Sequence, residues 1–190
     1  MKKILLALCI LLGCVYALSA QVDAEIPKGN VVLFDGFENG NYWIWAGFDW
    51  DQYGVHKFST GANISKDWSS EGRHSLELTM DPMPADSSKS AVWFYDGTND
   101  MSGAKYLVID FYNPENYVYN IAAVLQTTDS WKWCQTASYN IPKGKHTVVF
   151  DIRAYTDTLN DVRRVSVTHN GWQAVPVETH IYIDNIRFVK

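Results

Sequence analysis

Alternation of apolar and polar side chains with a period of two runs through most of the chain after residue 30, and turn residues interrupt it at short intervals. Residues two apart in a β-strand lie on the same face of a sheet, so this alternation predicts strands that are buried on one side. The predicted strands cover residues 30–40, 42–48, 53–60, 72–80, 90–96, 105–113, 119–128, 130–140, 146–152, 163–170 and 180–189. About ten antiparallel strands with short connections predict an all-β protein, a β-sandwich of the jelly-roll type.

The alternation also assigns side chains to faces. In KYLVIDFYN, Leu107, Ile109 and Phe111 form an apolar face, and Asp110 and Tyr112 lie on the opposite, mixed face. Such strands are typical of a sheet with one face on the core and the other in water.

In YNIAAVLQT, the core candidates are Ile121, Ala123 and Leu125, with Gln126 on the opposite face. We therefore predict that Asp110, Tyr112 and Gln126 line one polar second face of the sandwich.

The last strand, HIYIDNIRFV, contains a change of phase. Ile181 and Ile183 form one apolar pair, and the next pair is Ile186 and Phe188. Both pairs can face the core only if the segment Asp184–Asn185 accommodates one extra residue, as a β-bulge does.

A carboxylate at such a bulge needs a partner, because burial of an unpaired charge is costly. The first strand carries Asp35 and Glu38. If the first and last strands are neighbours, Glu38 and Asp184 converge, and a calcium ion could compensate both charges. The alternative is that this segment is only a turn and that Glu38 is solvated.

Aromatic residues make up 14% of the chain, including 8 Trp and 11 Tyr. Tryptophan prefers sites with one wet edge, so this content favours a binding surface. In SWKWCQ, Trp131, Trp133 and Gln135 are spaced two apart, and a strand there places them on one face with Cys134 on the other. We predict an exposed pair of tryptophans, with core burial as the alternative. Trp45 and Trp93 are further binding candidates.

The N-terminal residues 1–20 have the order of an export signal, with two lysines, an apolar run and small residues. We expect a secreted or periplasmic protein whose single domain covers residues 21–190. Lipidation at Cys14, which would anchor the protein at the cell surface, is the alternative. Of the 3 cysteines, Cys134 alone lies outside this signal, so the domain has no disulfide. The net charge of -5 argues against nucleic acids and anionic membranes as partners, and we expect no membrane span.

Three segments carry a resemblance to a known family: LFDGFENGNYW, WSSEGRHSLELTM and IYIDNIRF. In order and spacing they resemble the non-catalytic carbohydrate-binding modules with a calcium-containing jelly-roll fold, such as those attached to bacterial β-glucanases and mannanases. The resemblance implies a structural calcium at Glu38 and Asp184, with main-chain oxygens near residues 71–74. It does not select the ligand-binding aromatics, whose positions vary within the family. Such modules usually accompany an enzyme, which is a possible partner here.

The sequence lacks a recognisable catalytic motif. No spacing singles out the pair of carboxylates that a glycosidase needs, and the five histidines are scattered. We expect a secreted, non-catalytic protein that binds a β-glycan, a polysaccharide or oligosaccharide. The ligand-binding candidates are Trp131, Trp133, Gln126, Gln135, Asp110, Tyr112, Trp45 and Trp93. The alternatives are a structural or adhesive surface protein on the same scaffold, and a small β-sandwich glycoside hydrolase.

Overall fold

The computed structural model describes residues 22–39, 45–46, 61–80, 82, 90–169 and 177–190. The side chains of residues 45–46 and 90–96 lie outside this description. The export signal over residues 1–20 and the strand expected over 53–60 also lie outside the described residues.

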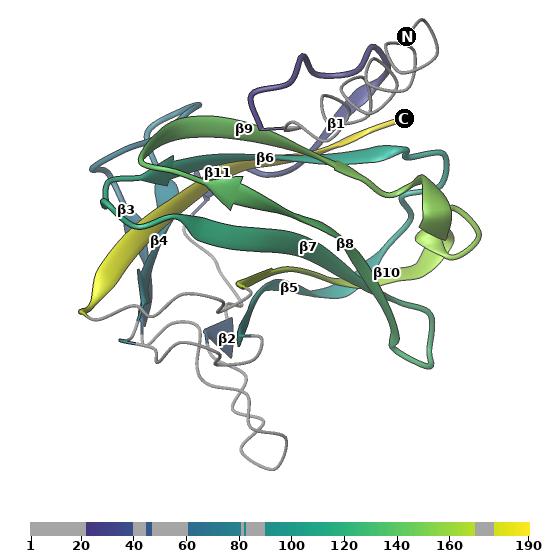
Figure 1. Ribbon diagram of the computed structural model, residues 1–190. Coiled ribbons are helices and arrows are strands. Elements are labelled where there is room, and N and C mark those ends of the chain that lie inside the picture. The colour runs from purple at the N-terminus through teal and green to yellow at the C-terminus, as the bar shows by residue number, and fades with distance from the viewer. Residues whose placement is uncertain (1–21, 40–44, 47–60, 81, 83–89, 170–176) are drawn as a thin grey trace, which may run out of the picture.

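Two antiparallel sheets face each other and enclose the core (Figure 1). Sheet A has the order β3-β4-β11-β6-β9, and β1 also pairs with β11. Its strands are β1 (Val31–Asp35), β3 (Gly61–Ser65), β4 (Ser75–Met80), β6 (Tyr106–Asn113), β9 (Gly144–Asp151) and β11 (Thr179–Val189). Sheet B has the order β2-β5-β10-β7-β8. Its strands are β2 (Trp45–Ala46), β5 (Ser90–Asn99), β7 (Tyr119–Thr127), β8 (Lys132–Ile141) and β10 (Val162–His169).

The chain passes repeatedly between the sheets after β4. It runs to β5 in sheet B, returns to β6, makes the β7–β8 hairpin in sheet B, and then alternates through β9, β10 and β11. Two short 3₁₀ helices, η3 (Arg153–Tyr155) and η4 (Leu159–Asp161), connect β9 to β10. The predicted all-β jelly-roll sandwich is confirmed. The prediction missed β3, because GANIS combines a glycine and small polar residues with a single large apolar side chain.

The core lies between the sheets and is built from the predicted apolar faces. Leu107, Ile109 and Phe111 of β6 are fully buried and belong to one cluster with the apolar side chains of β7. The β7 members are Ile121, Ala123 and Leu125. The small Cys134 of β8 is also buried there and free of any disulfide.

The predicted bulge in β11 is present. Asp184 pairs with Asp110 of β6, and Arg187 pairs with Val108, so three steps along β11 match two along β6. Asn185 has a φ of 50°, a left-handed conformation that asparagine tolerates better than most residues. The apolar pairs on both sides of the bulge therefore reach the same core.

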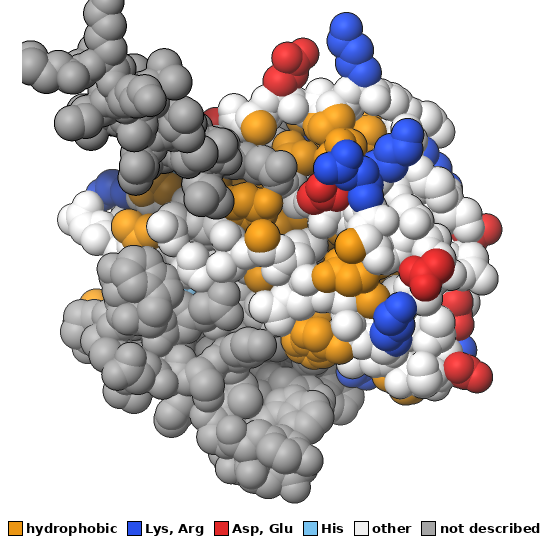
Figure 2. Space-filling view, turned by 45° about the vertical axis from the view of Figure 1, so that its right-hand side comes forward, with side chains coloured by type: hydrophobic (Ala, Val, Ile, Leu, Met, Phe, Trp, Pro, Cys, Tyr) orange, Lys and Arg blue, Asp and Glu red, His pale blue; other side chains and the backbone are white. Residues whose placement is uncertain are grey.

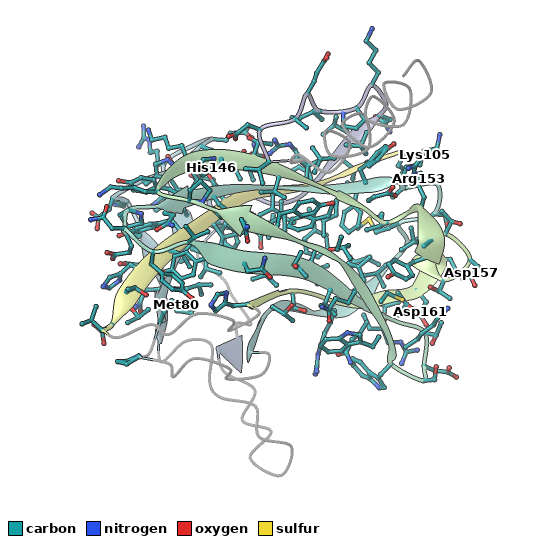
Figure 3. All side chains as sticks on the ribbon, in the orientation of Figure 1. Met80, Lys105, His146, Arg153, Asp157 and Asp161 are labelled. Atoms are coloured by element: carbon teal, nitrogen blue, oxygen red, sulfur yellow. The ribbon has the colours of Figure 1, made fainter. Side chains whose placement is uncertain are left out.

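Figure 3 places Met80 and Asp161 toward opposite ends of the sandwich.

Within the described residues, no helix is long and apolar enough to cross a membrane.

Candidate functional site

The outer face of sheet B, the face directed away from sheet A, carries an exposed aromatic and polar cluster at one end. Trp133 of β8 lies directly opposite Gln126 of β7, and Gln126 lies opposite Arg164 of β10. The Trp133 indole N–H donates to the Gln135 Oε1 at 3.1 Å, and an Arg164 N–H lies 3.5 Å from the Gln126 Oε1. Trp133 is 43% exposed, so its ring is not part of the core.

Trp131 joins this cluster from a turn. Its N–H donates to the Thr128 carbonyl at 3.1 Å, its φ is 56°, and β8 begins only at Lys132. The prediction that Trp131 continues the strand alternation is therefore wrong, because the turn after β7 breaks the period of two. Trp131 is nevertheless 40% exposed.

Two arginines of β10 lie against the Trp131 ring. The guanidinium carbons of Arg164 and Arg163 are 4.8 Å and 5.7 Å from the ring centroid, within the range of cation–π attraction. Arg163 is held in place by Asp161, whose carboxylate accepts hydrogen bonds at 3.1 Å and 3.2 Å from its Nε and at 3.1 Å from its Nη2. The Asp161 carboxylate, which accepts these hydrogen bonds, raises the pKa of Arg163.

We call Trp131, Trp133, Gln126, Gln135 and Arg164 the tryptophan surface. It brings together four of the predicted ligand-binding residues. Arg164 was not predicted, although its place opposite Gln126 follows once the β7–β10 register is known.

The tryptophan surface covers only one end of the outer face. Farther along, side chains that do not belong to the core between the sheets are nonetheless fully buried: Ala122, Val124, Ser166 and Thr168. Trp45 of β2 pairs with Trp93 of β5, and Trp93 pairs with Ser166, so their backbones belong to the same sheet. The side chains of Trp45 and Trp93 lie outside the described residues.

Asp110 and Tyr112 do not lie with the tryptophan surface. Their strand, β6, belongs to sheet A, so the single polar face predicted for Asp110, Tyr112 and Gln126 is wrong. Alternation shows whether a side chain points inward or outward, but it does not show to which sheet the strand belongs.

Asp110 is the centre of a polar network on sheet A. Arg187 donates to it through two nitrogens at 2.9 Å and 3.1 Å, and the Thr147 hydroxyl donates at 2.7 Å. Burial acts to raise the pKa of Asp110, but the hydrogen bonds from Arg187 and Thr147 outweigh it and hold that pKa below its ordinary value. Tyr112, on the same face, stacks on Tyr182 with a ring-centroid distance of 5.7 Å.

Glu38 and Asp184 bind the same loop, residues 66–74, which joins β3 to β4. The Glu38 Oε1 accepts the N–H groups of Arg73 and His74 at 2.7 Å and 2.8 Å. The Asp184 Oδ2 accepts the N–H groups of Ser70 and Glu71 at 2.7 Å and 3.0 Å. The two residues predicted as calcium ligands are thus brought to one loop, where their carboxylates accept hydrogen bonds from backbone N–H groups.

The charges at this loop distinguish the two carboxylates. The backbone N–H groups of Arg73 and His74 lower the pKa of Glu38, so its charge is compensated. Burial raises the pKa of Asp184. It also raises the pKa of Asp35, with the nearby Asp184 adding to that effect.

If a calcium ion binds here, the Asp35 carboxylate, whose pKa is raised by burial and by the charge of Asp184, is a candidate ligand in addition to Glu38 and Asp184. Within the described part of the chain, no group of three or more His, Cys, Asp or Glu side chains could hold a metal ion. Main-chain carbonyl oxygens would therefore have to supply several of the ligands, as the resemblance implies.

The surface of the sandwich carries both positively and negatively charged side chains. In Figure 2, lysine, arginine and acidic side chains are interspersed among small groups of apolar side chains. On the face shown there, the described apolar side chains do not form one continuous area.

No protein-family model matches the sequence, and no curated protein matches it. Solved structures do match over most of the chain. A carbohydrate-binding module of family 28, specific for non-crystalline cellulose, is 20% identical with a TM-score of 0.60, and the match covers 86% of this chain and 97% of that one. A family 27 module from Caldicellulosiruptor saccharolyticus, solved with mannohexaose, is 17% identical with a TM-score of 0.57, covering 85% and 98%. A family 11 module from Clostridium thermocellum, solved with a β-1,3-1,4-mixed-linked tetrasaccharide, is 12% identical with a TM-score of 0.54, covering 86% and 97%.

Proposed function

We propose that this chain is a secreted, non-catalytic carbohydrate-binding protein whose tryptophan surface binds a β-glycan. The observation that carries the proposal is the pair of exposed tryptophans at one end of sheet B, Trp131 (40% exposed) and Trp133 (43% exposed), with amide and guanidinium groups beside them. The fold shared with the modules of families 28, 27 and 11 is consistent with it.

The chemistry of this surface suits a sugar ring. A pyranose presents an apolar face of C–H groups and a rim of hydroxyl groups. An indole ring covers the apolar face, and Gln126, Gln135 and Arg164 can exchange hydrogen bonds with the rim. Because such a surface is shallow and wet, we expect a dissociation constant in the millimolar to micromolar range, about -4 to -8 kcal/mol.

The two alternative functions make different demands on the same residues. A glycoside hydrolase needs two carboxylates across the sugar. Asp161, which lies beside the tryptophan surface, is bound to Arg163. Absence of reducing-sugar release from glucans and mannans would exclude that alternative. An adhesive surface protein would use the same indoles against a protein, and would not bind glycans.

Truncation of Trp133 tests the proposal. Trp133→Ala should weaken binding to a soluble β-glucan, mannan or mixed-linkage glucan by more than about 1 kcal/mol, because a stacking surface is lost. The free energy of unfolding should change by less than about 0.5 kcal/mol, because the ring is exposed. Affinity electrophoresis and urea denaturation on the same protein measure both quantities.

Leu33→Ala is the matched control, since Leu33 is an exposed apolar residue on sheet A, 56% accessible. It should leave glycan binding unchanged. The proposal fails if the wild-type protein binds none of these glycans. It also fails if Trp133→Ala binds as well as the wild type does.

A further inference from the structure

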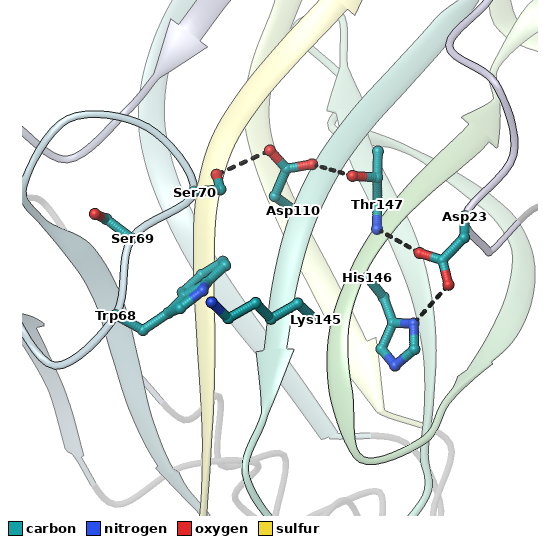
Figure 4. Close-up of a pocket in the computed structure, with 8 residues that line it drawn as sticks. All are labelled: Asp23, Trp68, Ser69, Ser70, Asp110, Lys145, His146 and Thr147. Carbon is teal, nitrogen blue, oxygen red and sulfur yellow. Dashed lines mark hydrogen bonds and ion pairs between the residues drawn. The ribbon is translucent and has the colours of Figure 1, made fainter.

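A polar pocket lies on the outer face of sheet A, on the opposite sheet from the tryptophan surface. Its volume is about 420 Å³, and Figure 4 shows the residues that line it. They come from four separate parts of the chain: Asp23, Trp68, Ser69, Ser70, Asp110, Lys145, His146 and Thr147. All of them belong to the described residues.

The floor of the pocket is fixed before any ligand arrives. Asp110 is bound by Arg187 and Thr147, and the Ser70 hydroxyl donates to its Oδ2 at 2.9 Å. On the far wall, Asp23 accepts the Thr147 N–H at 3.0 Å and contacts the His146 Nδ1 at 2.8 Å. A site held in this way loses little conformational freedom on binding.

Trp68 supplies an apolar wall. Its ring packs against Tyr112 at 5.7 Å between centroids, and its carbonyl accepts the Ser75 hydroxyl at 2.7 Å, which fixes the backbone beneath it. Only 8% of Trp68 is exposed, so it offers a small contact area and not a broad stacking surface.

Two exposed charges of opposite sign remain for a ligand. The Lys145 side chain extends toward Trp68 in Figure 4, and its ammonium group has no hydrogen-bond or ion-pair partner among the described residues. Asp23, on the other side, is 57% exposed and retains acceptor capacity. The charge of Asp110 is already matched by Arg187.

A hydroxyl-rich, uncharged molecule matches this arrangement. Hydroxyl groups both donate and accept, so a sugar in this pocket can accept from Lys145 and donate to the carboxylates that line it, with its C–H groups against Trp68. We propose that this pocket is a second binding site, which takes a single uncharged pyranose unit such as a chain end. The site does not depend on the tryptophan surface.

Nuclear magnetic resonance titration of the full chain tests the proposal through the Trp68 indole N–H signal, assigned by its loss in Trp68→Phe. Glucose, mannose and galactose are the probes, and at least one should shift this signal saturably, with a dissociation constant in the millimolar range. Lys145→Met keeps most of the aliphatic stem and removes the ammonium group, so it should weaken this binding at least about fivefold.

Lys143→Met is the matched control, because Lys143 lies only two residues before Lys145, in the β8–β9 connection, and its ammonium group contacts Asn116 at 3.2 Å instead. It should bind like the wild type. Trp133→Ala should leave the Trp68 response unchanged, which separates this site from the tryptophan surface. The proposal is overturned if none of the three sugars gives a saturable shift, or if Lys145→Met binds like the wild type. It is also overturned if only glucuronate or sulfate shifts the signal, since the pocket would then be an anion site.

Discussion

His169 of β10 is a buried histidine held neutral by its surroundings. Its Nδ1 lies 3.2 Å from the Asn120 N and 3.1 Å from the Asn120 O, and its Nε2 lies 3.1 Å from the Tyr117 hydroxyl. The side chain is fully buried, and this burial lowers its pKa to about 4. In the unfolded chain, the pKa of a histidine returns to about 6.5.

This difference in pKa predicts acid sensitivity from one residue. Between about pH 6.5 and pH 4 the unfolded chain binds a proton at His169 and the folded chain does not, so stability is complete above pH 6.5 and falls as the pH decreases. The loss amounts to about 3 kcal/mol by pH 4. His169→Gln retains hydrogen-bonding capacity and cannot titrate. Its free energy of unfolding, measured in urea from pH 4 to pH 7, should therefore fall less steeply than that of the wild type.

The comparison uses only the slopes, because His169→Gln is expected to be less stable at every pH. Parallel curves for the two proteins across this range would show that His169 is protonated equally in the folded and unfolded chains.

At the scale of elements, the loop between β3 and β4 is organised by carboxylates from the two ends of the chain. Asp184 holds its centre, at Ser70 and Glu71, and Glu38 holds its end, at Arg73 and His74. Gly72, between the segments that Asp184 and Glu38 bind, has a φ of 63°, and a Cβ there would collide with the Glu38 carboxylate. The glycine therefore serves both the backbone turn and the approach of Glu38.

Gly72→Ala should lower the free energy of unfolding more than an alanine does at an ordinary left-handed glycine. Any L-residue at such a position costs about 1 to 2 kcal/mol. At Gly72 the Glu38 carboxylate must also move, which weakens the hydrogen bonds that it accepts from Arg73 and His74, so the loss should exceed that at an ordinary left-handed glycine. Gly103→Ala is the control, because Gly103 has a φ of 81° and open space where its Cβ would lie. If Gly72→Ala and Gly103→Ala lower the free energy of unfolding by equal amounts in urea denaturation, the Glu38 contact does not stabilise the loop.

The sequence predicts elements better than it predicts their partners. The β11 bulge follows from the shift in phase between Ile183 and Ile186, and the inward side of β6 follows from alternation; both are local properties. The separation of Asp110 from Gln126 depends on which sheet each strand joins, which is decided by contacts between distant segments. The prediction that Trp131 lies in a strand fails for a local reason, because Trp131 and Trp133 are two residues apart in the sequence whether Trp131 lies in a strand or in the preceding turn.

At the scale of the whole molecule, the first and last strands of sheet A, β1 and β11, pair with each other. Val31 pairs with Val189, and Asp35 pairs with Ile186, so β1 brings the Asp35 carboxylate close to the β11 bulge. Burial raises the pKa of both Asp35 and Asp184, and the charge of Asp184 contributes to the shift at Asp35. A bound cation would turn this repulsion into a link between the two ends of the fold.

We therefore expect calcium to stabilise the whole domain. A chelator should lower the midpoint of thermal unfolding, and calcium should restore it by mass action, by about 2.7 kcal/mol at a concentration one hundred times the dissociation constant. Asp35→Asn should abolish this response, because it removes a charged oxygen ligand while its amide oxygen can still accept the Phe37 N–H. In the presence of chelator, Asp35→Asn should unfold at the same temperature as the wild type or higher, since the repulsion of Asp184 is gone.

Glu38→Gln separates the two possible ligand sets in the same experiment. If calcium binds Asp35 and Asp184, Glu38→Gln lowers the melting temperature through the loop but keeps the response to calcium. If Glu38 is itself a ligand, as the family resemblance implies, the response disappears in this variant as well. An identical melting temperature for the wild-type protein in chelator and in saturating calcium would exclude the metal. The ends of the fold would then be held by the β1–β11 pairing and by the loop contacts of Glu38 and Asp184.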